Sequence, residues 1–256
     1  MTESLAGKVA IITGAGKGIG RGVSLALAGQ GAHVVATGRT LADVEETAAL
    51  VTKRGGSASA ALCDVGNAQH IDDVVASTKS EHGRIDIVIN NAQGGPGHAS
   101  GQLLKVAPQD FIDAFTTGPL ATFRMMVACQ PHLAATSGVI VNFATGAGIR
   151  PDPIGYGCYA AVKEAIRALT RAAAVEWGQF GVRVHTVIPL ANSAALEAWA
   201  AARPEESAAF YNSVPLRRVG DTEHDIGSIV TFLCSPASGY MTGNTILADG
   251  GQGYIQ

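Results

Sequence analysis

Short apolar segments typical of buried strands alternate along the chain with longer segments whose apolar residues recur at helical spacing. The strand-like segments span residues 8–13, 32–37, 57–62, 85–90, 138–144, 182–188 and 244–248, and the helix-like ones span 23–28, 41–53, 68–82, 108–115, 121–133, 158–177, 194–211 and 223–234. Strands that alternate with helices build a parallel sheet covered by helices on both faces. We therefore expect an α/β fold with a doubly wound parallel sheet of about seven strands.

The length and composition narrow the class of protein. The chain has 256 residues and no Pro/Ser-rich or low-complexity linker, so we expect a single domain over residues 1–256. A net charge of −3 argues against a nucleic-acid-binding protein. No apolar run approaches the roughly 20 residues of a membrane span, and the N-terminus does not resemble a signal peptide. The four cysteines form no CxxC pair, which fits a cytoplasmic protein without a cysteine metal site.

A glycine-rich turn follows the first expected strand and opens the first helix. Residues 13–20 read TGAGKGIG, with glycines at positions that permit a tight turn and a close approach of the backbone to a ligand. The N-terminus of a helix that follows such a turn can face a diphosphate. The segment therefore predicts nucleotide binding, and the alternative is a purely structural turn.

A second candidate motif lies on the long helix expected over residues 158–177. Tyr159 and Lys163 are four residues apart, so they share one helix face. A free tyrosine has a pKa of about 10, and a nearby cation can lower that pKa by roughly 1–3 units. A phenol tuned in this way can exchange protons with a substrate. The alternative is an exposed Tyr–Lys pair without a chemical role.

Together these motifs make the sequence resemble the short-chain dehydrogenase/reductase family over essentially its whole length. The resemblance also includes Asp64-Val65 after the third strand, Asn90-Asn91-Ala92 after the fourth, and Asp249-Gly250-Gly251 near the C-terminus. It implies a Rossmann-type fold and an oxidoreductase that interconverts a secondary alcohol and a ketone by hydride transfer.

The resemblance also implies individual roles. The cofactor site would comprise Gly14, Lys17, Gly18, Ile19, Gly20, Arg39, Asp64, Val65, Asn91, Ala92, Tyr159, Lys163 and Pro189. Tyr159 would be the general acid/base, and Lys163 would lower its pKa and hold ribose hydroxyls of the nicotinamide side. Thr145 stands where the family has its catalytic serine and would position the substrate oxygen. The alternative for Thr145 is an ordinary strand residue.

Several positions depart from the family pattern. Gly118 stands where the family has an asparagine that helps carry a water-linked proton path to the lysine, so this relay is in doubt. Gln93 and Leu190 each replace a usual glycine, and we expect His185 to be structural. These departures keep open a second hypothesis, a cofactor-binding protein with little or no turnover. A third hypothesis, a Rossmann-fold methyltransferase, would not need the Tyr–Lys pair.

The cofactor is expected to be NADP(H) rather than NAD(H). A ribose without a 2′-phosphate is usually met by an acidic residue at the end of the second strand. Here that end reads Thr37-Gly38-Arg39-Thr40, and Lys17 lies in the glycine turn. Lys17 and Arg39 could clamp a 2′-phosphate. The alternative is that both are solvated surface bases.

The substrate side is less defined. We expect a mobile lid over residues 190–215, with Leu196, Trp199, Phe210 and Tyr211 among its alanines. These residues suit an apolar carbonyl or alcohol substrate, or they pack the lid on the body. His98 in a glycine-rich loop is a further candidate contact. The resemblance suggests a homotetramer with the helices at 121–133 and 158–177 at its interfaces.

Overall fold

Seven strands form one sheet in the order β3-β2-β1-β4-β5-β6-β7, and every neighbouring pair is parallel. The strands are β1 (Val9–Thr13), β2 (His33–Gly38), β3 (Ser57–Leu62), β4 (Ile87–Asn90), β5 (Val139–Phe143), β6 (Arg183–Pro189) and β7 (Thr245–Ala248). The computed structural model describes residues 4–94, 99–149 and 155–253. The expected α/β class and parallel sheet are confirmed.

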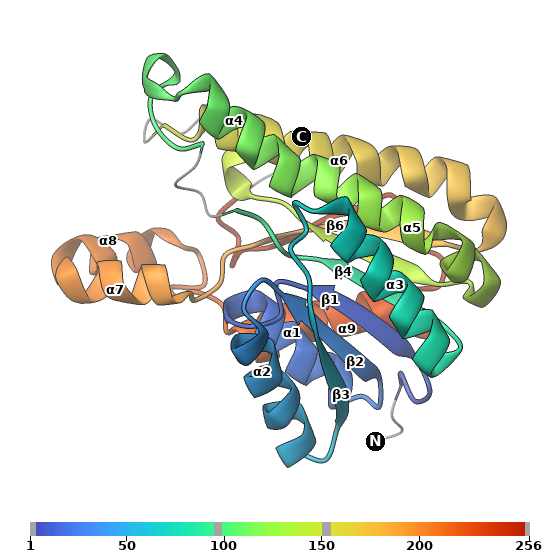
Figure 1. Cartoon of the computed structure of the whole chain (residues 1–256). Coiled ribbons are helices and arrows are strands. Elements are labelled where there is room, and N and C mark those ends of the chain that lie inside the picture. The colour runs from blue at the N-terminus through green and yellow to red at the C-terminus, as the bar shows by residue number, and fades with distance from the viewer. Residues whose placement is uncertain (1–3, 95–98, 150–154, 254–256) are drawn as a thin grey trace.

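Alternate residues of the central strands face two separate helical layers. On β1, Ala10 and Ile12 pack into one apolar core, while Val9 and Ile11 pack into the other. The first core lies under α1 (Gly18–Ala28), α2 (Leu41–Lys53) and α9 (Ser228–Cys234), and the second lies under α3 (Ala68–His82), α5 (Ala121–Thr136) and α6 (Gly157–Trp177). Figure 1 shows these two layers on opposite sides of the sheet. Successive residues of a strand point to opposite faces, and here both faces are buried, so the central strands form continuous apolar runs.

Helix α1 begins at Gly18, five residues before the start that the sequence predicted. Glycine is a poor helix former, so the prediction placed 18–22 in the turn. In the structure Gly20 and Gly22 are buried, and a Cβ at Gly22 would overlap Thr222. Close packing therefore overrides the low intrinsic helix propensity at this point.

Helix α4 (Pro108–Phe115) ends, and α5 begins, at the residues that the sequence predicted. The segment between them was not predicted: a π-helical turn over Thr116–Leu120 joins the two helices. Gly118 and Pro119 disfavour a regular α-helix at this point. Instead, the wider π turn keeps the chain helical through them, and turns of this kind are frequent at functional sites.

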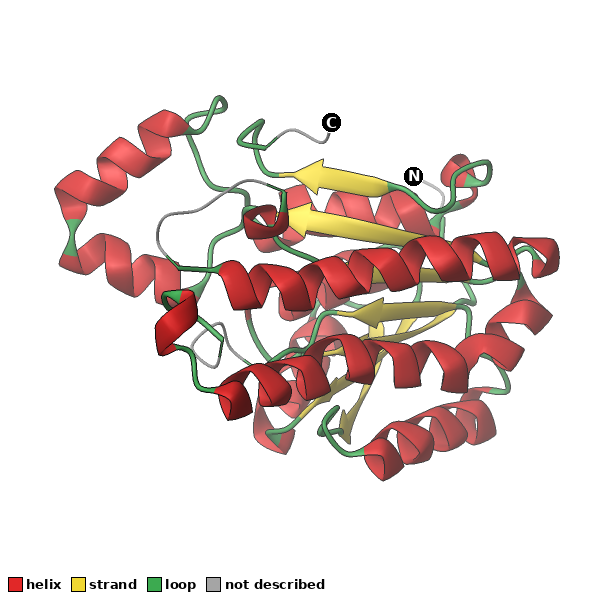
Figure 2. Cartoon of the chain, turned by 90° about the horizontal axis from the view of Figure 1, so that it is seen from above, coloured by secondary structure: helices red, strands yellow, loops and turns green. Residues whose placement is uncertain are grey.

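The expected lid segment forms two helices, α7 (Ala194–Ala202) and α8 (Pro204–Ser213). They project from the body of the molecule in two perpendicular views (Figures 1 and 2). Trp199 and Phe210 meet edge to face, with ring centroids 5.9 Å apart. This contact packs the two helices against one another. Among the described residues, no helix has the length and apolar character needed to cross a membrane.

Candidate active site

The candidate site lies at the carboxyl edge of the sheet, where the strand order changes direction between β1 and β4. The chain runs from β1 to β2 and β3 on one side, and then crosses back to β4 on the other. Ligands of open parallel sheets bind in the crevice that forms at such a point. The ends of β1, β4 and β5 therefore bring their following loops to one place.

The glycine turn leaves the start of α1 open. Lys17 is at the N-cap position but makes no capping hydrogen bond, and the first turn carries no acidic residue. Gly18 has φ +52°, and a Cβ there would meet nothing within 4 Å. Exposed N–H groups at a helix start suit a diphosphate. A dinucleotide cofactor therefore fits these residues.

Asn91 holds the glycine turn against the end of β4. Its side-chain Nδ2 donates to the carbonyl oxygens of Thr13 at 3.0 Å and Gly14 at 3.1 Å. The backbone N–H groups of Asn91 and Ala92 both donate to Thr13 Oγ1 at 3.1 Å. Gly20 is needed for the same packing, because a Cβ there would overlap the Gly14 carbonyl oxygen. Asn91 and Gly20 thus shape the loop itself.

Several predicted cofactor residues line one hollow of about 140 Å³ beside this loop. Its walls are Gly14, Gly38, Arg39, Cys63, Asp64, Val65, Ala92, Gln93, Gly94 and Thr117. Sequence reasoning missed Thr117, because it lies in the π turn and belongs to no motif. Its Oγ1 accepts a hydrogen bond of 3.3 Å from the Gly94 N–H and so ties the π turn to the loop after β4.

Thr145 and Tyr159 meet through their hydroxyl groups. Thr145 follows β5 and caps the short turn Gly146–Gly148, where its Oγ1 accepts from the Ala147 N–H at 3.4 Å. Tyr159 lies in the first turn of α6 and hydrogen-bonds to Thr145. The hydroxyl groups of these two residues thus lie side by side.

Lys163 lies one helical turn beyond Tyr159, as the spacing predicted. Its Nζ is 5.9 Å from the centroid of the Tyr159 ring and donates to the Phe143 carbonyl oxygen at 3.0 Å. The side chain is buried, and burial lowers its pKa to about 7. No sequence signal could have identified the Phe143 acceptor, because it is a backbone group.

The pKa of Tyr159 differs from the sequence-based expectation. Burial raises this pKa, and the hydrogen bond from Thr145 opposes the rise. The expectation of a lowered pKa is wrong in this structure, because removal of the phenol from water is the largest cause of the shift and Lys163 is not among its causes. Both members of the pair are therefore biased toward their neutral forms.

The two predicted phosphate-binding bases are in different situations. Lys17 Nζ forms an ion pair of 3.0 Å with Asp43 on α2. Arg39 is exposed and has no ion-pair partner among the residues that the structure describes. The structure therefore does not bring the two bases together as a free pair.

The remaining candidates are spread over the site and its surroundings. Pro189 ends β6, and Ile19 packs against the core. His185 is buried within β6, and burial is the main cause that lowers its pKa to about 4. Ser193 caps α7 by accepting from the Leu196 N–H at 3.2 Å. His98 lies outside the described residues.

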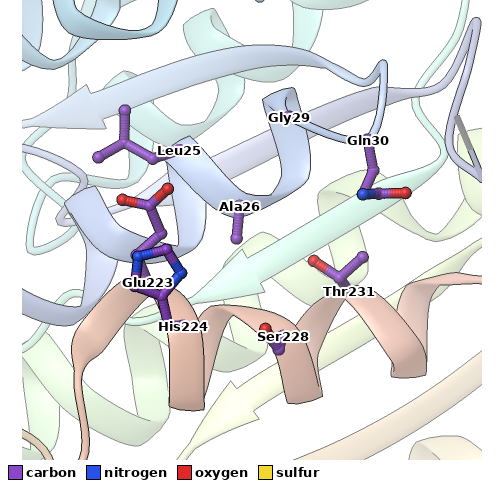
Figure 3. A pocket seen from close by; sticks show the side chains of 8 residues that line it. All are labelled: Leu25, Ala26, Gly29, Gln30, Glu223, His224, Ser228 and Thr231. Atoms are coloured by element: carbon purple, nitrogen blue, oxygen red, sulfur yellow. The ribbon is translucent and has the colours of Figure 1, made fainter. Parts of the chain in front are cut away.

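A separate hollow of about 280 Å³ lies between α1 and the segment that leads into α9. Figure 3 shows its eight lining side chains, which include Glu223, His224 and Thr231. Glu223, one of these residues, forms an ion pair of 2.8 Å with Arg54. None of the eight is a predicted site residue, so this hollow is distinct from the candidate active site.

Comparisons with known proteins agree with this geometry. The family model described as enoyl-(acyl carrier protein) reductase matches residues 14–252. The chain is 41% identical over 257 residues to 12alpha-hydroxysteroid dehydrogenase of a Clostridium species, covering 96% of this chain and 97% of that protein. It is 31% identical over 254 residues to 3beta-hydroxysteroid dehydrogenase 1 of Eggerthella lenta, covering 98% and 95%.

A solved structure has the same fold. A short-chain type dehydrogenase/reductase from Mycobacterium ulcerans matches with a TM-score of 0.90 at 26% identity, covering 97% of this chain and 90% of that chain. Because these matches extend over nearly the whole sequence, the protein belongs to the short-chain dehydrogenase/reductase family of NAD(P)-dependent oxidoreductases, which act between alcohols and ketones.

Proposed function

We propose that the protein is an NADP(H)-dependent oxidoreductase that interconverts a secondary alcohol and a ketone, with Tyr159 as its general acid/base. The observation that carries this proposal is that the half-buried Tyr159 lies both beside the Thr145 hydroxyl and 5.9 Å, measured from its ring centroid, from the buried ammonium of Lys163. The alternative of a binding protein with little turnover gives no reason for placing a cation in the interior.

The chain's own groups divide the chemistry as follows. In the reducing direction, Tyr159 donates its proton to the carbonyl oxygen while Thr145 Oγ1 hydrogen-bonds to the same oxygen as negative charge develops there. The Lys163 ammonium stabilises the phenolate that remains. When bound, the nicotinamide cofactor supplies the hydride. In the oxidising direction, Tyr159 accepts the proton from the alcohol.

The cofactor would be held by the glycine turn and by the hollow next to it. The open N–H groups at the start of α1 suit the diphosphate. Asp64, Val65 and Ala92 line the place proposed for the adenosine side. Arg39 supports the choice of NADP(H), because its exposed guanidinium borders this hollow and has no described acidic partner. Lys17 contributes less, since Asp43 already pairs with it.

We further propose a flat, apolar alcohol or ketone of the hydroxysteroid type as substrate. Two relatives that span nearly the whole chain are named as hydroxysteroid dehydrogenases. A hollow of about 660 Å³ at the base of the α7–α8 pair, with Leu190 and Leu216 among its lining residues, includes neither Thr145 nor Tyr159. The proposal of an apolar substrate is therefore supported by the relatives and by the apolar side chains of the α7–α8 pair, such as Trp199 and Phe210.

Assembly and location complete the proposal. We propose that the chain is a single domain that acts as a homotetramer. Large apolar side chains are exposed on the helical layer of α5 and α6, including Phe123, Val127 and Val175, and a partner copy would cover them. The four cysteines all carry free thiols, which supports a cytoplasmic location.

The test is steady-state oxidation of NADPH with a panel of ketones that includes keto-steroids and small aliphatic ketones. Turnover that is faster with the keto-steroids is expected. If no ketone and no corresponding alcohol is converted by folded, cofactor-binding protein, the chain is better described as a binding protein.

A further inference from the structure

The side chain of Gln93 carries two buried polar atoms without partners. Gln93 follows β4 directly after Asn91-Ala92, and both its Oε1 and its Nε2 are inaccessible to solvent. Neither atom has a hydrogen-bond partner among the described residues. A buried amide that is left unpaired is costly, so it is normally bonded to protein or to an ordered water. The amide therefore points to an interaction that the other side chains do not account for.

The amide lies against the π turn, on the face that Gly118 leaves free. A Cβ placed at Gly118 would lie 3.6 Å from Gln93 Nε2 and 2.9 Å from Val162 Cγ1. Gln93 and Val162 thus both lie next to Gly118: a Cβ there would be in ordinary contact with the Gln93 amide but would have to displace Val162. The side chain of Gln93 therefore occupies the space that a side chain at position 118 would fill, so the carboxamide at this place comes from the loop after β4 and not from the π turn.

The same region contains a second group with unused hydrogen-bonding capacity. Val162 directly precedes Lys163, whose ammonium can donate three hydrogen bonds. Among the described residues, the Phe143 carbonyl is the acceptor for Lys163 Nζ, at 3.0 Å. A buried cation with unused donors and a buried amide with a free acceptor thus lie on neighbouring segments. A single water bridges groups of this kind readily.

We propose that Gln93 is a positioning residue, whose carboxamide bonds through a bound water to the ammonium of Lys163 and holds that ammonium in place for Tyr159. This inference rests on the proposed function of the Tyr159–Lys163 pair. Gln93 also borders the hollow proposed for adenosine, but its amide atoms are not exposed to that hollow. A direct bond to the cofactor would need the side chain to move, which favours the role toward Lys163.

The groups in contact with Lys163 determine which titration the pH profile of kcat can reveal. Tyr159 on α6 is the titratable side chain in contact with it. From β5 it meets the Phe143 carbonyl, which does not titrate. An acceptor that reaches the ammonium favours its charged form. Removal of that acceptor therefore lowers the pH at which the charge is lost.

The test variant is Gln93→Met, which keeps the length of the side chain and removes both polar atoms. In ketone reduction with NADPH, we expect kcat to fall about tenfold and the alkaline limb of its pH profile to move down by about one pH unit. The KM values for ketone and cofactor should stay within a factor of about two, since only uniform binding changes KM alone. Gln109→Met, the same change on the exposed face of α4, should leave all these quantities unaltered.

A second set of variants tests whether the loss of activity in Gln93→Met comes from altered packing rather than from the missing carboxamide. Gln93→Gly should lose activity as Gln93→Met does. Gln93→Gly combined with Gly118→Asn and Val162→Ala should regain most of it, because the carboxamide then returns from the other side of the contact and the Val162→Ala change removes the methyl that a Cβ at 118 would meet. Val162→Ala alone is the control for that change. An unshifted pH profile in Gln93→Met, or a loss confined to the KM or Kd of the cofactor, overturns the inference. So does a folded triple variant that regains nothing. Absence of turnover in the wild type would instead refute the proposed function.

Discussion

Lys163 Nζ lies 5.9 Å from the centroid of the Tyr159 ring, one turn along the same helix; the Lys163 side chain is buried and that of Tyr159 is half-buried. Burial disfavours the charged form of each residue, so it raises the pKa of Tyr159 and lowers that of Lys163 to about 7. A charge kept in the interior works against folding. The pair is therefore a place where function and stability oppose each other.

The first prediction concerns the stability and the turnover of a variant without the buried ammonium. Lys163→Met removes the buried ammonium and keeps most of the apolar stem, so it should raise the free energy of unfolding by about 2 kcal/mol at pH 7 while turnover is lost. The gain is smaller than the pKa shift alone implies, because the Phe143 carbonyl loses its donor. Denaturant unfolding measures the stability, and exposed Lys53→Met is the matched control.

The same variant predicts a pH dependence. The pKa of Lys163 is about 7 in the folded chain against an ordinary value of 10.5. Between these values the unfolded chain binds more protons, so the wild type gains stability as pH rises through this range. The excess of the free energy of unfolding of Lys163→Met over that of the wild type should be largest below pH 7 and shrink toward pH 10. An excess that stays constant with pH would show that the titration of Lys163 does not cause the difference in stability.

A second prediction separates the hydroxyl of Thr145 from its shape. Thr145→Ser keeps the hydroxyl and should keep most activity. Thr145→Val keeps the branched shape, removes the donor to the substrate oxygen, and should lower kcat roughly 10²–10³-fold. Circular dichroism and cofactor titration should show an unchanged fold. If Thr145→Val turns over within a factor of a few of the wild type, Thr145 is only a strand-end residue and another group holds the substrate oxygen.

A third prediction concerns the cofactor. NADPH should bind more tightly than NADH, and Arg39→Ala should narrow the difference by about 10- to 100-fold, as the loss of one charged hydrogen bond implies. Lys17→Ala should narrow it less, because Asp43 already neutralises that ammonium. Fluorescence titration gives both dissociation constants. Equal constants for the two cofactors in the wild type would remove the basis for the NADP(H) proposal.

Local periodicity predicted most of the fold. The continuous apolar run of β1 and the helical spacing over Leu41–Lys53 placed these elements correctly, because β1 is buried on both faces and α2 packs its apolar face against the core. The prediction was wrong where tertiary contacts override local propensity. Gly20 and Gly22 lie within α1, where neighbouring backbone atoms leave no room for a Cβ, so their low helix propensity misled the prediction of where the helix begins. The π turn that contains Gly118 was likewise not predicted.

The site shows the same division. The spacing of Tyr159 and Lys163 predicted their shared face, and the turn at Gly14 predicted where a diphosphate could bind. Spacing carries no information on desolvation, so the direction of the Tyr159 pKa shift was predicted wrongly. The contact between Gln93 and Gly118 joins two loops far apart in sequence, and it becomes visible only when the chain is folded.

The most direct test of the account is the kcat for ketone reduction by Tyr159→Phe with NADPH. The variant keeps the ring and its packing but has no proton to donate, so kcat should fall by at least about 10³-fold, within the usual range for a general acid. The Kd of NADPH and the unfolding midpoint should stay close to those of the wild type. A kcat within tenfold of the wild type would contradict Tyr159 as the general acid/base and, with it, the proposed mechanism.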